Sequence, residues 1–488
     1  MSYSLEEKIR RFAIFSRIII ILLQFVSNFL IPDHDAGVFQ KPLDPNITET
    51  KLDRIVGGAL GGFSRWDAQY FLHVAEYGYT YENTLAFFPA FPFIIRQVTY
   101  FILYIVNNLL GSFLPCRDII SMHNALLLVA VVINNCVFVK TSLTLYKLSL
   151  AVLKDEKLSY ISAILFCVNP ASIFFSAAYS ESFYCFFVFF GLLNIETKNS
   201  ILNYILIGLS GVTRSNGLIN TGFIAYKYMK LKVNKNLNFF FNIIFSFGLF
   251  LSILPFLLYQ GYCCAKYCIP NKVALPNFIF SHGIENCYVF PGSNSSWCSW
   301  NIPFAYSYVQ DHYWNVGFLK YYQFKQIPNF ILAAPIVYIV FNGVYKFVKT
   351  YKNLIFYLGF IDGNAPGELP LRVFPYVAHC FALTVFSVLM IHVQVATRLL
   401  ASSSPVVYWF CASKLSPAFK DTVEREVLGK LTKKSNGQFY ESYSNRKSKW
   451  KTFILTESFN GYSLFIKYYF LSYFVVGTVL FSNYLPWT

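Results

Sequence analysis

The chain has 488 residues, of which 56% are hydrophobic, 20% are aromatic and only 13% are charged. Together with a mean hydropathy of +0.46, these values exclude a soluble globular protein, because so few polar residues cannot cover the surface of a body this size. The net charge of +16 does not indicate a nucleic-acid partner, because the lysines stand in short clusters between apolar runs rather than on one polar face.

Apolar runs close to the length that crosses a bilayer recur along the sequence, which predicts an all-α, multi-pass membrane protein with a single domain over residues 1–488. The first run follows Lys8, Arg10 and Arg11 and precedes no small-residue cleavage site, so we expect an uncleaved signal anchor with a cytosolic N-terminus. The predicted helical spans lie near 12–31, 97–114, 119–139, 158–193 as a pair, 200–226, 237–259, 327–345, 371–393 and 461–484.

The loops between these spans divide into two kinds. Two glycosylation sequons, at Asn46 and Asn294, fall in the segments 32–96 and 260–326, which we therefore predict to be luminal. Lysine-rich segments mark the predicted cytosolic loops, at 140–157, 227–235, 346–352 and 430–451. The polar, unpatterned stretch 411–451 is expected to be a weakly ordered cytosolic insert.

One conflict remains in this predicted topology. If the first loop is luminal, the two spans between 97 and 139 would return the chain to the lumen, whereas the lysine-rich segment that follows is predicted to be cytosolic. We expect a hairpin or a short broken helix at 86–96, where Pro89 and Pro92 interrupt the apolar run.

Cysteines are concentrated in the segment 260–326. This density predicts an oxidising lumen and a loop closed by a disulfide. A zinc site is the alternative, but His282 and His312 lack the compact paired spacing of zinc ligands, so we expect no metal site. The cysteines concerned are Cys263, Cys264, Cys268, Cys287 and Cys298.

The most informative segment is SRWDAQYFLHVAEYGY, residues 64–79. Its aromatic residues recur at helical spacing, which predicts a helix lying on the bilayer surface at headgroup depth. Asp67 would lie at the boundary between water and lipid, where it could meet a sugar whose lipid tail stays in the membrane, and we expect its neighbours Trp66 and Arg65 to bind substrate. The alternative is an ordinary interfacial helix with Asp67 as its N-cap or as an ion-pair partner of Arg65.

Three more polar positions interrupt apolar segments. The polar run 213–217 divides the span 200–226 into two half-helices, whose tip, with Arg214 and Asn216, is predicted to face a cavity and to bind a lipid phosphate. Glu181 is a second candidate for substrate binding and the alternative, structural partner of Arg214. The run 394–405 adds Gln394 and Arg398 as further candidates for substrate binding, and Arg398 could bind a second phosphate or extend to the membrane surface.

Several motifs are missing from the sequence. It contains no GxxxxGK[ST] loop, no HExxH, no GxGxxG after a strand and no acidic DxD pair in the first loop. A nucleotide-sugar donor is therefore disfavoured, and we expect a lipid-linked donor and no cofactor. A general base that deprotonates an acceptor hydroxyl, with cations that neutralise a leaving phosphate, would suffice for glycosyl transfer.

The order and content of these segments resemble the GPI mannosyltransferase family that adds the second mannose, called PIG-V in animals, within the GT-C class of polytopic glycosyltransferases. The resemblance rests on six blocks in the family's order, namely RWDAQYFLHVAEYGY (65–79), FFPAFP (87–92), NPASIFFSAAYSES (169–182), GVTRSNGL (211–218), HVQVATRLLASSSPVVYW (392–409) and LPWT (485–488).

This resemblance implies a GT-C helical bundle in the endoplasmic reticulum membrane. It also implies a dolichol-phosphate-mannose donor, a mannosylated glucosaminyl-phosphatidylinositol acceptor and an α-1,6 linkage formed with inversion at the luminal face. Asp67 would be the catalytic residue, with Trp66 shaping the sugar site, and a small membrane subunit is a possible partner by analogy. The rival interpretations are a GT-C transferase with another acceptor and a lipid or solute transporter, although we find no internal repeat typical of transporters.

Overall fold

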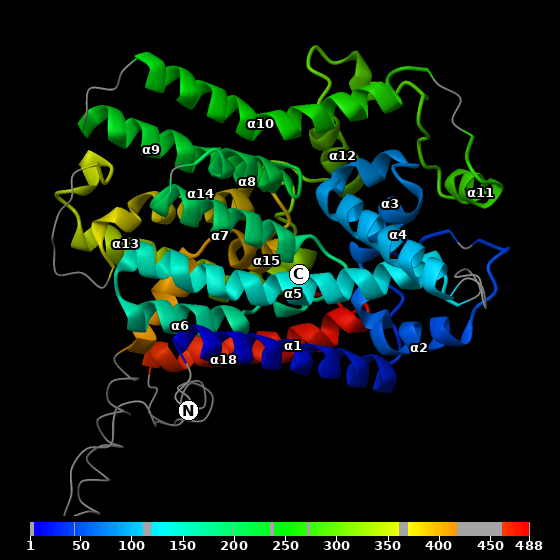
Figure 1. Cartoon of the computed structure of the whole chain (residues 1–488), viewed down its shortest axis with the longest axis horizontal. Coiled ribbons are helices and arrows are strands. Elements are labelled where there is room, and N and C mark those ends of the chain that lie inside the picture. Colours follow the sequence, from blue (N-terminus) through cyan, green and yellow to red (C-terminus); the bar gives the residue numbers. More distant parts are fainter. Residues whose placement is uncertain are drawn as a thin grey trace, which may run out of the picture.

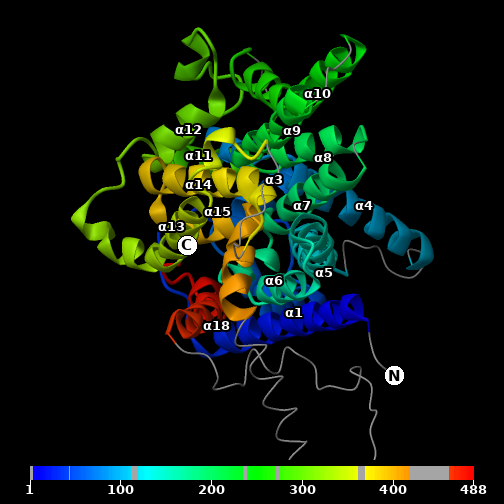
Figure 2. The same ribbon diagram turned by 90° about the vertical axis from the view of Figure 1, so that its left-hand side faces the viewer.

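A computed structural model (Figures 1 and 2) describes residues 4–42, 44–110, 119–198, 200–234, 239–270, 274–360, 369–416 and 461–487. These ranges contain helices, turns and irregular segments but no strand, so the all-α prediction is confirmed. Seven helices within them are long and apolar enough to cross a membrane. They are α1 (Leu5–Leu30), α4 (Ala90–Leu110), α5 (Met122–Leu153), α10 (Phe239–Tyr267), α13 (Ile327–Thr350), α14 (Phe374–Leu389) and α18 (Gly461–Ser482).

Shorter helices fill the space between the long ones. They are α2 (Lys51–Leu60), α3 (Ala68–Tyr77), α6 (Glu156–Cys167), α7 (Glu181–Thr197), α8 (Leu202–Gly211), α9 (Thr221–Asn234), α11 (Asn277–Glu285), α12 (Ala305–Trp314) and α15 (Ala396–Ser403). The core lies around α5, α6 and α7, and in it Phe138 of α5 stacks on Phe166 of α6 with ring centroids 4.8 Å apart. The predicted pair within 158–193 is confirmed as α6 and α7, joined by a buried turn.

A buried arginine of α1 fixes that turn. The Arg17 side chain donates to the Ser172 carbonyl at 2.9 Å and to Ser176 Oγ at 3.1 Å, and lies over the Phe138 ring. Asn134 Nδ2 on α5 donates to the Tyr179 carbonyl at 3.0 Å. The turn is therefore tied to two long helices just before it reaches α7.

The two ends of the bundle differ in composition (Figure 1). The lysine-bearing C-terminal ends of α5, α9 and α13 lie at the left, whereas α2, α3, α11 and α12 lie at the right. Both sequons belong to segments next to the right-hand group, before α2 and between α11 and α12, and Asn46 and Asn294 are both exposed. The lysine clusters at the C-terminal ends of α5, α9 and α13 lie at the end opposite the sequons, which agrees with the predicted cytosolic and luminal ends, whereas single lysines such as Lys51 and Lys266 also occur near the sequons.

Helix α4 corrects the predicted topology. The expected break at 86–96 is wrong, because α4 is continuous from Ala90 and Pro92 lies in its first turn, where proline is tolerated. The helix meets the length criterion for a span, yet Figure 1 places it at the same end as α2, α3 and α11, and α5 begins there. The chain therefore runs once along the bundle in α5, which removes the conflict noted above.

Two segments predicted as loops are helical in part. The lysine-rich segment 140–157 is largely the last four turns of α5, which ends at Leu153 and is followed by Lys154 as a left-handed C-cap. The polar insert was predicted to start at 411, but residues 406–416 are helical, and Cys411 and Leu415 are fully buried. The rest of 411–451 lies outside the described residues.

Helix α3 does not lie on the bilayer surface, so the prediction of an interfacial helix at 64–79 is wrong. Seven of its ten residues are buried. Its aromatic Tyr70 stacks between Phe39 and Phe87, with centroid distances of 4.2 and 4.3 Å. The helical spacing was predicted correctly, but the aromatic face is covered by protein instead of lipid.

The predicted division of span 200–226 is confirmed. Helix α8 ends at Gly211, a 3₁₀ turn follows over Ser215–Asn220, and α9 begins at Thr221. The turn lies so close to α8 that a Cβ on Gly217 would be only 2.2 Å from the Ser210 carbonyl oxygen. Only glycine fits there, and this close approach places Arg214 at the tip between the two half-helices.

Candidate active site

A cavity of about 1050 Å³ opens between α3, the tip of the divided helix, α12 and α15. Asp67, Arg214 and Arg398 line it. Its wall is rich in aromatic side chains, which offer flat apolar faces and hydroxyl groups to a ligand. These are Trp66, Tyr70, Phe87, Tyr179, Tyr306, Tyr313 and Trp314.

Four charged side chains form a continuous chain along one wall. Arg398 Nη1 donates to Asp67 Oδ2 at 2.8 Å and lies 4.0 Å from Glu181 Oε1. Arg214 Nη1 donates to the same Glu181 oxygen. Because Glu181 is fully buried and lies between two guanidinium groups, it holds both arginines at the cavity wall.

The two partners in the Asp67–Arg398 pair differ in their surroundings. The Arg398 side chain is 14% exposed and lies over the faces of Phe174 and Tyr179, whereas the Asp67 side chain is 34% exposed. Burial lowers the pKa of Arg398, but the negative charges of Asp67 and Glu181 outweigh it and hold that pKa above its ordinary value. Arg398 is therefore a permanent cation in this cavity.

The backbone fixes the position of Asp67. Trp66 has a φ of 57°, in the left-handed region that is unfavourable for a bulky residue. The backbone N–H of Asp67 donates to the Tyr179 hydroxyl at 2.9 Å. Asp67 stands at the N-cap position of α3, but its side chain accepts no hydrogen bond from that helix, so the carboxylate does not act as a cap. Backbone strain held in this way is typical of functional sites.

Arg65 faces away from the cavity. Its guanidinium pairs with Asp33 at 2.7 Å and donates to Asn28 Oδ1 at 2.9 Å. The alternative ion pair between Arg65 and Asp67 is therefore wrong, because each has another partner. The expectation that Arg65 binds substrate is not supported by its position, because it holds the first loop against α1 instead.

The remaining predicted residues lie at or behind the cavity wall. Asn216 and Gln394 line it. Asn216 Nδ2 donates to Tyr184 Oη at 2.8 Å and to Ser403 Oγ at 2.9 Å, and Gln394 Oε1 accepts from Tyr321 Oη at 2.9 Å. Both amides are held in place by these bonds. Glu181 does not line the cavity and acts on a ligand only through the arginines.

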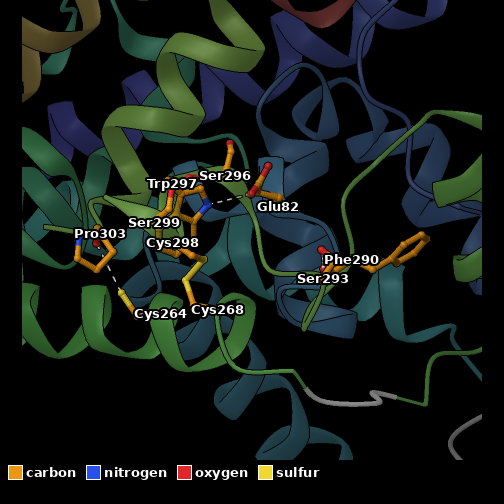
Figure 3. Close-up of a disulfide and its surroundings, with 10 residues drawn as sticks. All are labelled: Glu82, Cys264, Cys268, Phe290, Ser293, Ser296, Trp297, Cys298, Ser299 and Pro303. Atoms are coloured by element: carbon orange, nitrogen blue, oxygen red, sulfur yellow. Dashed lines mark hydrogen bonds between the residues drawn. A yellow bond between two sulfur atoms is a disulfide. The ribbon is translucent and has the colours of Figure 1, made fainter. Parts of the chain in front are cut away.

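The predicted disulfide loop lies next to Glu82, which in turn holds one aromatic residue of the cavity wall (Figure 3). Cys268 at the end of α10 is bonded to Cys298, which confirms the disulfide-closed loop; the other three cysteines of the cluster are free. Next to the bridge, Trp297 Nε1 donates to Glu82 Oε1 at 2.9 Å. Tyr313 Oη donates to the other Glu82 oxygen at 2.9 Å, which places the Tyr313 ring at the cavity. Among the described residues, no three His, Cys, Asp or Glu side chains gather as metal ligands do.

Several residues of the site were not predicted from the sequence. Tyr179 was read only as part of a polar turn, and Glu82, Tyr306, Tyr313 and Trp314 were not singled out. A signal did exist for α12, because its sequence AYSYVQDHYW alternates aromatic and polar residues within a cysteine-rich loop. Nothing local in the sequence indicates that this loop packs against α3.

Comparison with known proteins decides the family. The family model described as "Mannosyltransferase (PIG-V)" matches residues 6–488. The chain belongs to the PIG-V family of mannosyltransferases. It is therefore a glycosyltransferase. Similar relatives include the GPI alpha-1,6-mannosyltransferase 2 of Cricetulus griseus, 35% identical over 99% of both chains, and that of Homo sapiens, 34% identical over 99% of both. The GPI mannosyltransferase 2 of Drosophila melanogaster is 33% identical over 99% of this chain and all of its own.

Among solved structures, an oligosaccharyltransferase of Archaeoglobus fulgidus in its apo form matches with a TM-score of 0.43 and 11% identity, over 98% of this chain and 56% of its own. The cavity of this PIG-V mannosyltransferase thus brings together a partly exposed carboxylate, two guanidinium groups and several aromatic faces.

Proposed function

We propose that this GPI mannosyltransferase transfers mannose from dolichol-phosphate-mannose to the one-mannose GPI precursor, and forms an α-1,6 linkage with inversion. The observation that carries the proposal is the position of Asp67 at a cavity wall that also holds Arg214 and Arg398. The family match and the names of the full-length relatives support the choice of acceptor and linkage.

In this proposal Asp67 is the general base. A carboxylate at the cavity wall can accept the proton of the acceptor hydroxyl as that oxygen attacks the sugar carbon. Inversion requires one direct displacement and therefore one base and one leaving group. Glu181 does not compete for the role of base, because it is fully buried behind the arginines.

The leaving group in the proposal is dolichyl phosphate. Negative charge develops on its oxygen as the bond to the sugar breaks, and Arg214 and Arg398 lie at the wall where two guanidinium groups could neutralise that charge. We propose no resident cofactor, because the chemistry assigned to these residues is complete without one.

The border of the cavity favours lipid-linked substrates. Three apolar side chains that line the cavity are also exposed on the outside of the protein, namely Ile219 (42%), Phe386 (40%) and Met390 (37%). They could contact the hydrocarbon of a lipid while its polar head lies inside. We place the reaction at the luminal face of the endoplasmic reticulum, because the cavity lies near the end of the bundle that carries the sequons and the disulfide.

The test is product identification. Membranes that contain the protein are incubated with radiolabelled dolichol-phosphate-mannose and the one-mannose GPI precursor. We expect the label in a two-mannose GPI lipid, from which α-1,6-mannosidase releases the labelled mannose. Label in another glycolipid or in protein would overturn the proposed acceptor. The matched control is an incubation with donor alone, which should give no labelled product.

The role of Asp67 is tested in cells that lack the second GPI mannose. Asp67→Asn and Asp67→Ala are expected to leave surface GPI proteins unrestored at normal protein abundance, because neither side chain accepts a proton at neutral pH. Asp311→Asn is the matched control, since Asp311 lies at the rim of the same cavity, is 55% exposed and pairs with Lys320. Restoration by either Asp67 variant would show that Asp67 is not the base.

A further inference from the structure

The pairing of Asp67 with Arg398 has a consequence for the order of events. The carboxylate that is proposed as the base is held by one of the two cations proposed for the donor phosphate, at 2.8 Å. The Asp67 oxygen that accepts from Arg398 is taken up by this hydrogen bond and must leave it before it can meet an acceptor hydroxyl. In the donor-free cavity, one oxygen of the proposed base is therefore already bonded to Arg398.

We infer that the donor phosphate displaces Asp67 from Arg398, so that donor binding itself releases the base. This inference rests on the proposed function. It makes Arg398 a shared partner, bound to Asp67 before the donor arrives and to the phosphate afterwards, and it predicts that a donor-free enzyme does not activate the acceptor.

The geometry supports an exchange of partners at Arg398 rather than at Arg214. Arg214 pairs with Glu181, which is fully buried, whereas Arg398 pairs with Asp67, which is 34% exposed. Glu181 lies behind the cavity wall and cannot move towards a ligand, so the ion pair between Arg214 and Glu181 stays in place. Asp67 lies on the cavity side, and Glu181 Oε1 at 4.0 Å keeps Arg398 partly compensated while its other partner changes.

The charges and atoms balance in this scheme. Two arginines and two carboxylates give the empty wall no net charge, and the donor phosphodiester adds one negative charge. The bond between mannose C1 and the phosphate oxygen then breaks, and its electron pair stays on the phosphate. The acceptor oxygen bonds to C1, and its proton passes to the released Asp67 carboxylate. Neutral Asp67 no longer competes for Arg398, which stays with the dianionic product.

The test measures donor binding without turnover. Purified full-length protein in nanodiscs is titrated with radiolabelled dolichol-phosphate-mannose, without acceptor. If Asp67 competes with the phosphate, Asp67→Asn binds the donor roughly tenfold more tightly than wild type although it does not transfer mannose. Asp67→Ala is the second variant and is expected to change affinity in the same direction, so that the result does not depend on one substitution.

Two controls separate this effect from a general change in charge. Asp311→Asn removes the same charge from the cavity rim and is expected to change affinity by about twofold or less, because this exposed group is screened. The double variant Asp67→Asn with Arg398→Gln is expected to lose the gain in affinity. Equal or weaker binding by both Asp67 variants, or equal tightening by Asp311→Asn, would overturn the inference. Wild-type protein that binds no donor would instead refute the proposed function.

Discussion

The Tyr179 hydroxyl accepts a hydrogen bond from the backbone N–H of Asp67 at 2.9 Å. The bond joins the turn before α7 to the residue that follows the strained Trp66 at the start of α3. Tyr179 is itself fixed through its carbonyl, which accepts from Asn134 at 3.0 Å. The position of the proposed base thus depends on a turn more than one hundred residues away in the sequence.

Replacement of this tyrosine is expected to impair transfer. Tyr179→Phe removes one hydrogen bond, worth about 1 kcal/mol, and should lower kcat about fivefold if the bond positions Asp67 in the transition state. Initial rates at saturating donor and acceptor measure the effect. Tyr351→Phe is the control, because it removes a comparable bond, to the Leu369 carbonyl at 2.8 Å, far from the cavity. An unchanged rate in Tyr179→Phe would mean that the bond is only structural.

The second prediction concerns the shape of the cation at the tip of the divided helix. Arg214→Lys keeps the positive charge beside Glu181, so we expect normal abundance. An ammonium group cannot offer a planar pair of donors to a phosphate, so the donor Kd should rise at least about tenfold. A donor titration measures this. Equal affinity in Arg214→Lys and wild type would remove Arg214 from the phosphate site.

The third prediction tests which end of the bundle is luminal. Asn46 and Asn294 are exposed and belong to N-x-[ST] sequons. Asn46→Gln and Asn294→Gln should each remove one glycan and increase gel mobility by one step, and the double variant should migrate like the endoglycosidase-treated protein. If neither site carries a glycan while a sequon placed in the cytosolic loop after α9 does, the assigned orientation is reversed.

The fourth prediction is a dependence of stability on pH. Burial lowers the pKa of His73 to about 3, and this residue of α3 is hydrogen-bonded to Thr80 at 2.7 Å. The unfolded chain binds a proton at this position below about pH 6.5, whereas the folded chain does not, so stability falls as the pH falls from 6.5 towards 3. Between pH 6.5 and pH 5 the loss from this group is about 2 kcal/mol.

Thermal unfolding of the purified protein at pH 7 and pH 5 checks this prediction. His73→Asn should reduce the difference between the two pH values, whereas His34→Asn should not, because His34 is exposed. An equal pH dependence in wild type and His73→Asn would show that other groups account for the loss of stability.

The sequence predicted well which segments are helical, and less well where some of these helices lie in the bundle. Apolar length predicted α1, α5, α10, α13 and α18, because a long buried run has few alternatives to a helix in lipid. It also predicted a span at 97–114, yet α4 remains at one end of the bundle. Hydropathy indicates whether a helix is apolar and long enough to cross a membrane, but it does not show whether that helix runs along the bundle.

The site shows the same limit. Arg214 was predicted to lie at the tip of a divided helix because polar residues interrupt an apolar run there. Arg65 was expected beside Asp67 because the two are close in sequence, but at the N-terminus of α3 their side chains point to different partners. The pairing of Asp67 with Arg398 joins residues 331 positions apart, and no local pattern contains that information.

The disulfide between Cys268 and Cys298 forms by oxidation of two thiols, a reaction separate from the binding of any substrate. The aromatic face that Tyr313 contributes to the cavity rests on Glu82, and Glu82 also holds the tryptophan next to the bridge. Formation of the bridge fixes the chain directly beside Trp297, and with it the partner of Glu82 on which the Tyr313 side of the wall is built.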